Sequence, residues 1–234
     1  GKIKGVSMNK KPIFEIIADR LRQTEFKDDD IITLGKDFSL PSDEKGLRYV
    51  DGAKDGICAY HMVAAEITKK DIEEINKVIT LANKGDYDQA DSVLEKLCER
   101  IRVVNFIDEL QDCILDRKDE IEDKFYVYSL HLMTQSANIE CVKVGMMIQE
   151  LFTQSDEVKG MVRTLGLSDE FTLYSVFIMR NWENGNTEIM NIAKSVNGWG
   201  KVHAVHYIEP DTEEIRQWLL TDAVSNDVMP AYSG

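Results

Sequence analysis

From residue 57 onward, apolar residues recur at the spacing of amphipathic helices. The first stripe follows the i, i+3, i+4, i+7, i+8 pattern and consists of Ile57, Tyr60, His61, Ala64 and Ala65. Further helices are predicted over residues 72–82 and 86–101, and later ones start near residues 104, 119, 138, 156, 169, 187, 200 and 212. Successive starts lie roughly 13 to 19 residues apart, so connections are short and neighbouring helices are expected to run antiparallel.

Residues typical of helix ends support this division. Ser155 and Ser168 each precede two acidic residues, which is the pattern of a helix N-terminus. Gly185 and Gly198 stand where helices are expected to end.

The predicted helices repeat at a nearly fixed period. Residues 157–165 align with residues 188–196 at an offset of 31, and a third copy begins at Glu214. The helices between these copies also align, and their small residues, spaced 30 and 29 apart, are Gly145, Ser175 and Ala204. A small residue at one fixed point of each second helix predicts close helix-on-helix packing. The repetition indicates an all-α fold, a right-handed α-solenoid of antiparallel helix pairs.

Residues 199–205, followed by Glu209, Pro210 and Asp211, resemble the second helix and turn of a HEAT-type repeat. The resemblance to HEAT and armadillo helical-repeat proteins is clearest over residues 119–225 and looser over residues 57–118. It implies stacked helices with an extended surface. The repeats are short and lack the early proline and the Asp/Arg ladder of HEAT arrays, so the resemblance indicates a fold and no specific functional family.

The N-terminal residues have a different character. Pro12 begins a short predicted helix, residues 25–56 are rich in loop-forming glycine, and residues 47–52 are predicted as a strand and turn. We divide the chain into an N-terminal segment, residues 1–56, that packs on the array, and a helical repeat domain, residues 57–234. The last repeat stops in mid-unit at the end of the sequence, which predicts that the natural chain continues.

Charge and cysteine content narrow the function classes. The formal charge of −14 argues against a nucleic-acid partner, although residues 1–24 carry a net charge of +4. No apolar run approaches the roughly 20 residues of a membrane-spanning helix, so no membrane association is expected. The four cysteines form no C-x-x-C pair, which predicts reduced thiols in a cytoplasmic protein; they are Cys58, Cys98, Cys113 and Cys141.

Aromatic and basic residues near predicted turns are candidates for a partner surface. Trp218 occupies an apolar repeat position and is expected in the core. Trp182 and Trp199 border turns beside glycines, and Arg180 precedes Trp182. Because tryptophan and arginine dominate binding energy at protein interfaces, we predict that Arg180, Trp182 and Trp199 contact a partner.

Two histidines, His203 and His206, lie three residues apart on the same predicted helix, with Glu209 three residues further on. Glu209 is displaced around the helix and precedes a proline, so a metal site is not expected. His206 stands in an apolar column of the repeat, which predicts a buried or half-buried side chain. The pair is added to the predicted partner contacts.

An alternative hypothesis places chemistry near the N-terminal segment. Cys58 and His61 are three residues apart, just after Asp51 and Asp55, and a thiol beside an imidazole is the arrangement of a nucleophile with its base. His61 also belongs to the apolar stripe, where a carboxylate would satisfy it in the core. This alternative is an enzyme or small-ligand-binding protein with a pocket between the N-terminal segment and the repeat array.

No signature of a nucleotide enzyme, serine hydrolase, zinc peptidase or di-iron protein occurs in the sequence. The leading hypothesis is therefore a cytoplasmic, non-enzymatic scaffold or adaptor that binds a protein or peptide partner, without cofactor or metal. The sequence does not indicate an oligomeric state.

Overall fold

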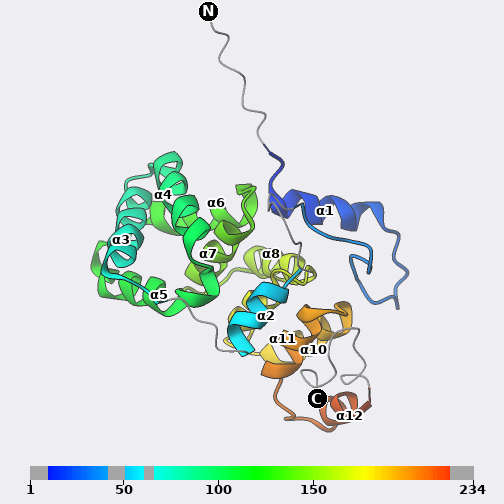
Figure 1. The fold of residues 1–234 in the computed structure, drawn as a ribbon. Helices are drawn as coiled ribbons and strands as arrows, with labels where there is room; N and C mark the ends of the chain where they lie inside the picture. Colours follow the sequence, from blue (N-terminus) through cyan, green and yellow to red (C-terminus); the bar gives the residue numbers. More distant parts are fainter. Residues whose placement is uncertain (1–9, 42–50, 61–65, 222–234) are drawn as a thin grey trace, which may run out of the picture.

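The computed structural model describes residues 10–41, 51–60 and 66–221 and contains, over these ranges, helices and no strand (Figure 1). The α-helices are α1 (Ile13–Gln23), α2 (Ala53–Tyr60), α3 (Lys69–Asn83), α4 (Tyr87–Arg100), α5 (Ile107–Asp116), α6 (Asp123–Gln135), α7 (Ile139–Gln149), α8 (Asp156–Gly166), α9 (Thr172–Met179), α10 (Gly185–Ser195), α11 (Trp199–Tyr207) and α12 (Glu213–Thr221). Two short 3-10 helices, η1 (Val103–Asn105) and η2 (Lys118–Glu120), flank α5. The prediction of an all-α fold is confirmed for the described residues. None of the described helices combines the length and apolar composition needed to cross a membrane.

The predicted helix starts agree closely with the observed ones. Each start predicted between residues 104 and 212 lies within four residues of an observed start. Gly185, however, begins α10 and does not end a helix. Glycine is required at this position because the chain folds back there, and a Cβ would lie 2.1 Å from the carbonyl oxygen of Met179. The predicted helical residues 61–65, most of the predicted strand at 47–52 and the chain from residue 222 onward lie outside the described residues.

One predicted N-cap is correct and another is wrong. Ser155 caps α8, since its hydroxyl accepts a hydrogen bond from the N–H of Val158. Ser168 does not start a helix, because the Thr172 hydroxyl donates back to the carbonyl oxygens of Gly166 and Ser168 and closes a tight turn before α9. Residues 169 and 170 therefore lie in that turn.

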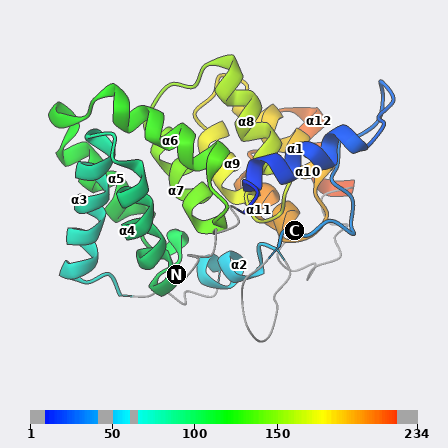
Figure 2. The same ribbon diagram turned by 90° about the horizontal axis from the view of Figure 1, so that it is seen from above.

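Helices that follow each other in the chain pack as pairs. The pairs are α3 with α4, α6 with α7, α8 with α9, and α10 with α11. The second helices also contact one another in order, α4 with α7, α7 with α9, and α9 with α11. Figure 2 shows the pairs following one another across the molecule, from α3 and α4 at one end to α10, α11 and α12 at the other.

Three of these second helices, α7, α9 and α11, are the inner helices of the fold. Every residue of 141–149 is buried in α7, and α9 buries all of its residues except Phe177. The outer helix α8 buries a single stripe, with Val158, Val162 and Leu165. The inner helices therefore form the centre of the core, covered from more than one side.

The small residues of the repeat lie where helices approach closely. A Cβ on Gly145 would lie only 2.7 Å from the carbonyl oxygen of Ser129 in α6. The Ser175 hydroxyl donates to the carbonyl oxygen of Val162 in α8 at 2.8 Å, and Ala204 is fully buried. The predicted close packing at these positions is confirmed.

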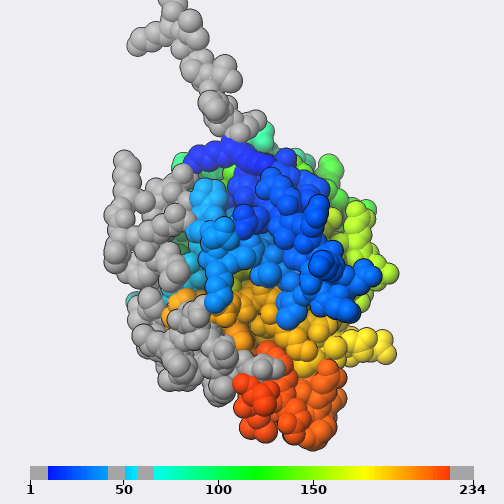
Figure 3. All heavy atoms as spheres, turned by 90° about the vertical axis from the view of Figure 1, so that its right-hand side faces the viewer, coloured from blue at the N-terminus to red at the C-terminus, as the bar shows by residue number. Residues whose placement is uncertain are grey.

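The N-terminal segment packs on two sides of the helical array. Helix α1 packs against α6 and α8 and buries Ile13 and Ile17. Residues 10–41 cover one face of the molecule beside α10, as Figure 3 shows. Helix α2 packs against η1 and α11, on the opposite side of the inner helices from α6 and α8 (Figure 2).

Candidate functional site

Two glycines bring the start of α2 close to the inner helices. Gly52 has a φ of +81°, a conformation that favours glycine, and a Cβ there would lie 2.7 Å from the carbonyl oxygen of Asp169. At Gly56 a Cβ would lie 2.3 Å from the indole ring of Trp199. This close approach places the acidic side chains of residues 51–55 beside the turn that precedes α9.

Charged side chains surround Lys143, which is buried in the middle of α7. This Lys143 cluster consists of Asp55, Arg102, Glu140, Lys143, Glu170 and Tyr174. Nζ of Lys143 lies 2.8 Å from Oδ2 of Asp55. The same nitrogen lies 2.7 Å from a carboxylate oxygen of Glu140 and 2.7 Å from one of Glu170. The hydroxyl of Tyr174 donates to Oδ2 of Asp55 at 2.9 Å, so residues from α2, α7 and α9 meet at one point.

Opposite charges decide the protonation states within the Lys143 cluster. Burial alone would raise the pKa of Asp55, but Lys143 and Arg102, which lies 3.1 Å from Oδ1, outweigh burial and hold that pKa below its usual value. Burial acts to lower the pKa of Lys143, yet the surrounding carboxylates raise it. Burial also raises the pKa of Tyr174 well above its usual value. Asp55 and Lys143 are therefore both ionised at neutral pH, and their ion pair attaches α2 to the inner helices.

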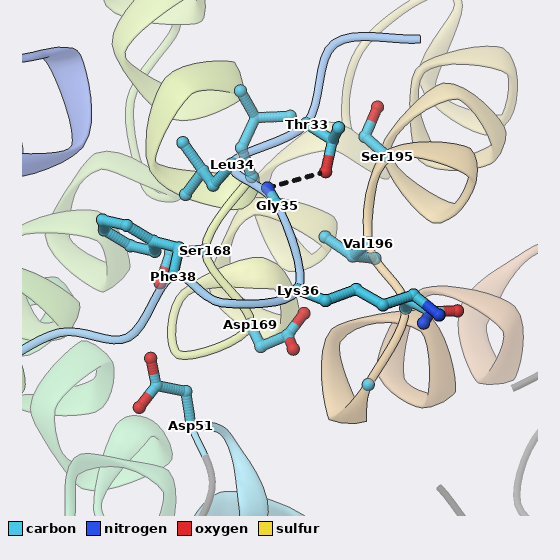
Figure 4. A pocket seen from close by; sticks show the side chains of 13 residues that line it. Thr33, Leu34, Gly35, Lys36, Phe38, Asp51, Ser168, Asp169, Ser195 and Val196 are labelled. Atoms are coloured by element: carbon cyan, nitrogen blue, oxygen red, sulfur yellow. Dashed lines mark hydrogen bonds between the residues drawn. The ribbon is translucent and has the colours of Figure 1, made fainter. Parts of the chain in front are cut away.

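Beside this cluster a pocket opens between the N-terminal segment and the turns that precede α9 and α11 (Figure 4). We call it the Asp169 pocket; its volume is about 290 Å³, and it is lined by residues 33–36, Phe38, Asp51, residues 167–169 and residues 195–198. In Figure 4, Asp51 and Asp169 lie on one side of the pocket, with Thr33 and Leu34 across from them. Of the residues that the alternative hypothesis names, Asp51 lines this pocket.

Asp169 titrates near neutral pH. Burial raises the pKa of Asp169 to about 7, and the neighbouring carboxylates of Asp51 and Glu170 add to the rise. A hydrogen bond from the N–H of Gly200, in the first turn of α11, opposes it. A carboxyl group with this pKa can donate or accept a proton at pH 7, or pair with a cation.

Ser168 adds a second polar group to the Asp169 pocket. Its side chain is buried, and its hydroxyl oxygen has no hydrogen-bond partner among the described residues. Across the ranges that the structure describes, no three His, Cys, Asp or Glu side chains are arranged to hold a metal ion. The pocket therefore offers a carboxyl pair and a hydroxyl to a ligand.

A second hollow lies at the C-terminal ends of the inner helices. We call it the Arg180 groove; its volume is about 400 Å³, and its lining includes Asp108, Glu109, Glu150, Phe177, Arg180 and Tyr207. The guanidinium of Arg180 lies 5.2 Å from the ring centre of Phe177 and 5.1 Å from that of Tyr207. These two rings meet edge to face. An exposed cation thus rests on an aromatic base that faces solvent.

The structure brings together only part of the predicted partner surface, which comprises Arg180, Trp182, Trp199, His203 and His206. Arg180 and His206 are exposed, and both pack on the ring of Tyr207. Trp182 is half-buried beside Arg163 of α8, and its indole N–H donates to the side chain of Gln154, just before α8, at 2.8 Å. Arg180 and His206 therefore belong to one surface, and Trp182 to another.

Trp199 and His203 lie in the core beneath α2, so the predicted residues do not share one exposed face. Trp199 packs with Ala53 and Val202. Burial lowers the pKa of His203 to about 4, which keeps the ring neutral. The prediction of a buried or half-buried His206 is wrong, since His206 is exposed and His203 points inward.

The two aspartates of the alternative hypothesis, Asp51 and Asp55, also lie in different sites. Asp55 belongs to the Lys143 cluster, whereas Asp51 lines the Asp169 pocket. The side chain of Cys58 and all of His61 lie outside the described residues, so their pairing stays a prediction.

Sequence reasoning missed most residues of the Lys143 cluster and the Asp169 pocket. One local signal was present, because Lys143 stands between Val142 and Val144 in a helix without a polar face. A lysine in such a position is rarely buried without a partner. The residues that pair with it carry no comparable signal.

The chain matches no protein-family model, no curated protein and no solved structure. Its function is therefore inferred from the geometry and chemistry of the described residues.

Proposed function

We propose that the protein is a non-enzymatic helical-repeat scaffold that binds a peptide segment of a protein partner in the Arg180 groove. The observation that carries this proposal is the exposed guanidinium of Arg180, held over Phe177 and Tyr207 in a hollow of about 400 Å³. Arginine and tyrosine are among the side chains that dominate the binding energy of protein interfaces. A site that is already formed also reduces the cost of ordering on binding.

The walls of the Arg180 groove favour a segment with both signs of charge. Asp108, Glu109 and Glu150 set three carboxyl groups against one guanidinium. Burial raises the pKa of Glu150, although a hydrogen bond from Gln111 and the charge of Arg180 oppose the rise, so a cation from the partner would compensate this carboxyl group. Arg180 in turn matches a carboxylate. We therefore expect a segment in which a lysine or arginine lies close to an acidic side chain or a C-terminal carboxylate.

We also propose that the protein is an α-solenoid and lies in the cytoplasm. The ordered contacts between helix pairs support a right-handed α-solenoid of the HEAT or armadillo kind, which presents an extended surface. The formal charge of −14 favours a protein partner over nucleic acid or an anionic membrane. Free thiols at Cys98, Cys113 and Cys141 support a cytoplasmic location.

Selection from a library of random peptides displayed on phage tests this function. We expect the selected peptides to share one basic and one acidic position. Arg180→Ala should weaken their binding at least tenfold and remove the preference for the acidic position, whereas Glu150→Gln should remove the preference for the basic position. Arg216→Ala, which changes an exposed arginine on α12 outside the groove, serves as the matched control and should leave binding unchanged.

Two results would contradict the proposal. One is a failure to enrich any peptide against the wild-type protein. The other is a set of enriched peptides that bind Arg180→Ala and Glu150→Gln as tightly as the wild type, because those peptides would use another surface.

A further inference from the structure

The Asp169 pocket is independent of the Arg180 groove and has a different chemical character. Two carboxyl groups, those of Asp51 and Asp169, line it, and Glu170 lies next in the chain. Among the described lining residues the one cation is Lys36, an exposed side chain whose stem crosses above Asp169 in Figure 4. Negative charge therefore exceeds positive charge in the lining, so the pocket is suited to a cation.

Asp51 and Asp169 are both fixed in position by backbone groups. Asp51 accepts a hydrogen bond from the N–H of Leu40 at 3.2 Å, and Asp169 accepts one from the N–H of Gly200. A Cβ on Gly200 would lie 2.5 Å from Oδ1 of Asp169, so the missing side chain lets this carboxyl group sit against the start of α11. Preorganised carboxyl groups bind a cation without first paying an ordering cost.

Ser168 supplies an independent sign of a ligand-binding site. Its residue is 2% exposed, and its hydroxyl oxygen has no hydrogen-bond partner among the described residues. Buried hydroxyl groups normally have such a partner. Ser168 lies on the pocket wall beside Phe38 in Figure 4, so a small movement of this wall would bring its hydroxyl oxygen to a donor inside the pocket.

The remaining wall is apolar and limits the size of the ligand. Leu34, Phe38, Leu167 and Val196 supply the apolar surface. A volume of about 290 Å³ admits a molecule of roughly ten non-hydrogen atoms. Since no described cluster of three His, Cys, Asp or Glu side chains could hold a metal ion, an organic cation fits better than a metal.

We propose that the Asp169 pocket binds a small organic ammonium ion, whose charged head pairs with Asp169 and Asp51 and whose aliphatic stem lies along the apolar wall. The ammonium N–H groups also donate to the hydroxyl oxygen of Ser168. The added positive charge favours the ionised form of Asp169, so binding releases a proton from that carboxyl group near neutral pH.

Isothermal titration calorimetry with n-pentylamine, 1,5-diaminopentane and phenethylamine tests the site, with 1-pentanol and pentanoate as probes of similar shape and different charge. We expect at least one amine, and neither control, to bind at pH 8. Affinity should rise about tenfold from pH 6 to pH 8, because the ionised fraction of a carboxyl group with a pKa of about 7 rises by that factor. Near pH 7 the binding heat should also depend on the ionisation enthalpy of the buffer, which reports the released proton.

Substitutions of the lining residues test whether the amine binds in the Asp169 pocket. Asp169→Asn should weaken amine binding at least tenfold and abolish its pH dependence, and Ser168→Ala should weaken it a few-fold. Asp112→Asn, on an exposed aspartate of α5, and Arg180→Ala, in the other hollow, should leave it unchanged. If Asp169→Asn folds poorly, the pH dependence and proton release of the wild type still decide the question.

Several outcomes would overturn the proposal. They are the absence of binding by all three amines at millimolar concentration, equal binding of 1-pentanol, amine affinity that does not change between pH 6 and pH 8, and tight binding of Mg²⁺ or Ca²⁺ that no amine displaces. None of these outcomes affects the peptide proposal, since that proposal rests on the Arg180 groove.

Discussion

Asp55 is buried and Asp169 half-buried close to where the start of α2 meets the inner helices, yet they hold their protons very differently. The Asp55 side chain is 1% exposed, and its pKa lies below the usual value. Asp169 borders a pocket, and its pKa rises to about 7. The more enclosed carboxyl group is the stronger acid, so the depth of burial does not decide protonation at this contact.

The neighbouring charges explain this reversal. Two unit charges 4 Å apart interact by about 4 kcal/mol at an effective dielectric constant of about 20, which corresponds to roughly 3 pK units. Asp55 has Lys143 at 2.8 Å and Arg102 at 3.1 Å, enough to offset its loss of solvation. The largest effect of a charge on Asp169 comes from Asp51, whose carboxylate further disfavours the ionised form of Asp169. Two cations thus stabilise the ionised form of Asp55, whereas burial and a neighbouring carboxylate both act against ionisation of Asp169.

Removal of the central cation should have the largest effect. Lys143→Met leaves three carboxylates of the Lys143 cluster with Arg102 alone, and loss of one partner from a buried ion pair costs about 3–5 kcal/mol in the free energy of unfolding. Urea denaturation at pH 7 measures the change. Lys69→Met, an exposed lysine of α3, is the control and should stay within about 0.5 kcal/mol of the wild type. A loss below about 1 kcal/mol for Lys143→Met would mean that the cluster is not ionised.

His203 is a buried base beneath α2, and its titration gives a second measurement at the contact between α2 and the inner helices. Its pKa is about 4 in the folded protein and about 6.5 when unfolded, so stability falls as the pH drops from 6.5 toward 4. At pH 5 the loss from this group amounts to about 2 kcal/mol. In urea denaturation between pH 5 and pH 7, His203→Gln should show a shallower decline, while His206→Gln, on the exposed histidine of the same helix, should follow the wild type. Equal pH slopes for His203→Gln and the wild type would disprove a neutral, buried His203.

Asp169 should give a smaller effect of the opposite sign. Because its folded pKa is raised to about 7, the stability that it contributes is present below about pH 4 and is lost as the pH rises through 7. Asp169→Asn should therefore gain on the wild type between pH 5 and pH 8, by about 1 kcal/mol because the open pocket screens the charge, or about 2–4 °C in melting temperature. Asp112→Asn should show no such gain. A constant difference between Asp169→Asn and the wild type at the two pH values would refute the raised pKa.

Local sequence spacing was sufficient to predict the helices and their pairing. The period of apolar residues placed the helix starts, and the column of Gly145, Ser175 and Ala204 predicted where helices touch, because both features depend on neighbouring residues in one or two helices. Gly185 could not be predicted in the same way. Its role is a close approach to the carbonyl oxygen of Met179, which only the folded turn creates.

The charged groups were harder to predict because their partners are remote in the chain. Asp51 and Asp55 were recognised as candidates, but Asp55 pairs with residues 88 and 119 positions away. Ser168 and Asp169 were expected to begin a helix and lie instead in the turn before α9, beside the pocket. Spacing along the sequence contains no information about which distant charges meet.

The long reach of Asp55 also constrains the order of events during synthesis. A ribosome adds about 5–20 residues per second, so Asp55 is made on the order of ten seconds before its partner Tyr174, 119 residues later. Before α7 and α9 are synthesised, neither Lys143 nor Tyr174 is present to pair with this carboxylate. The charge of Asp55 then keeps the nascent segment in water. Attachment of α2 therefore follows assembly of the inner helices, and a translating ribosome that stalls before residue 174 should leave the start of α2 open to proteolysis.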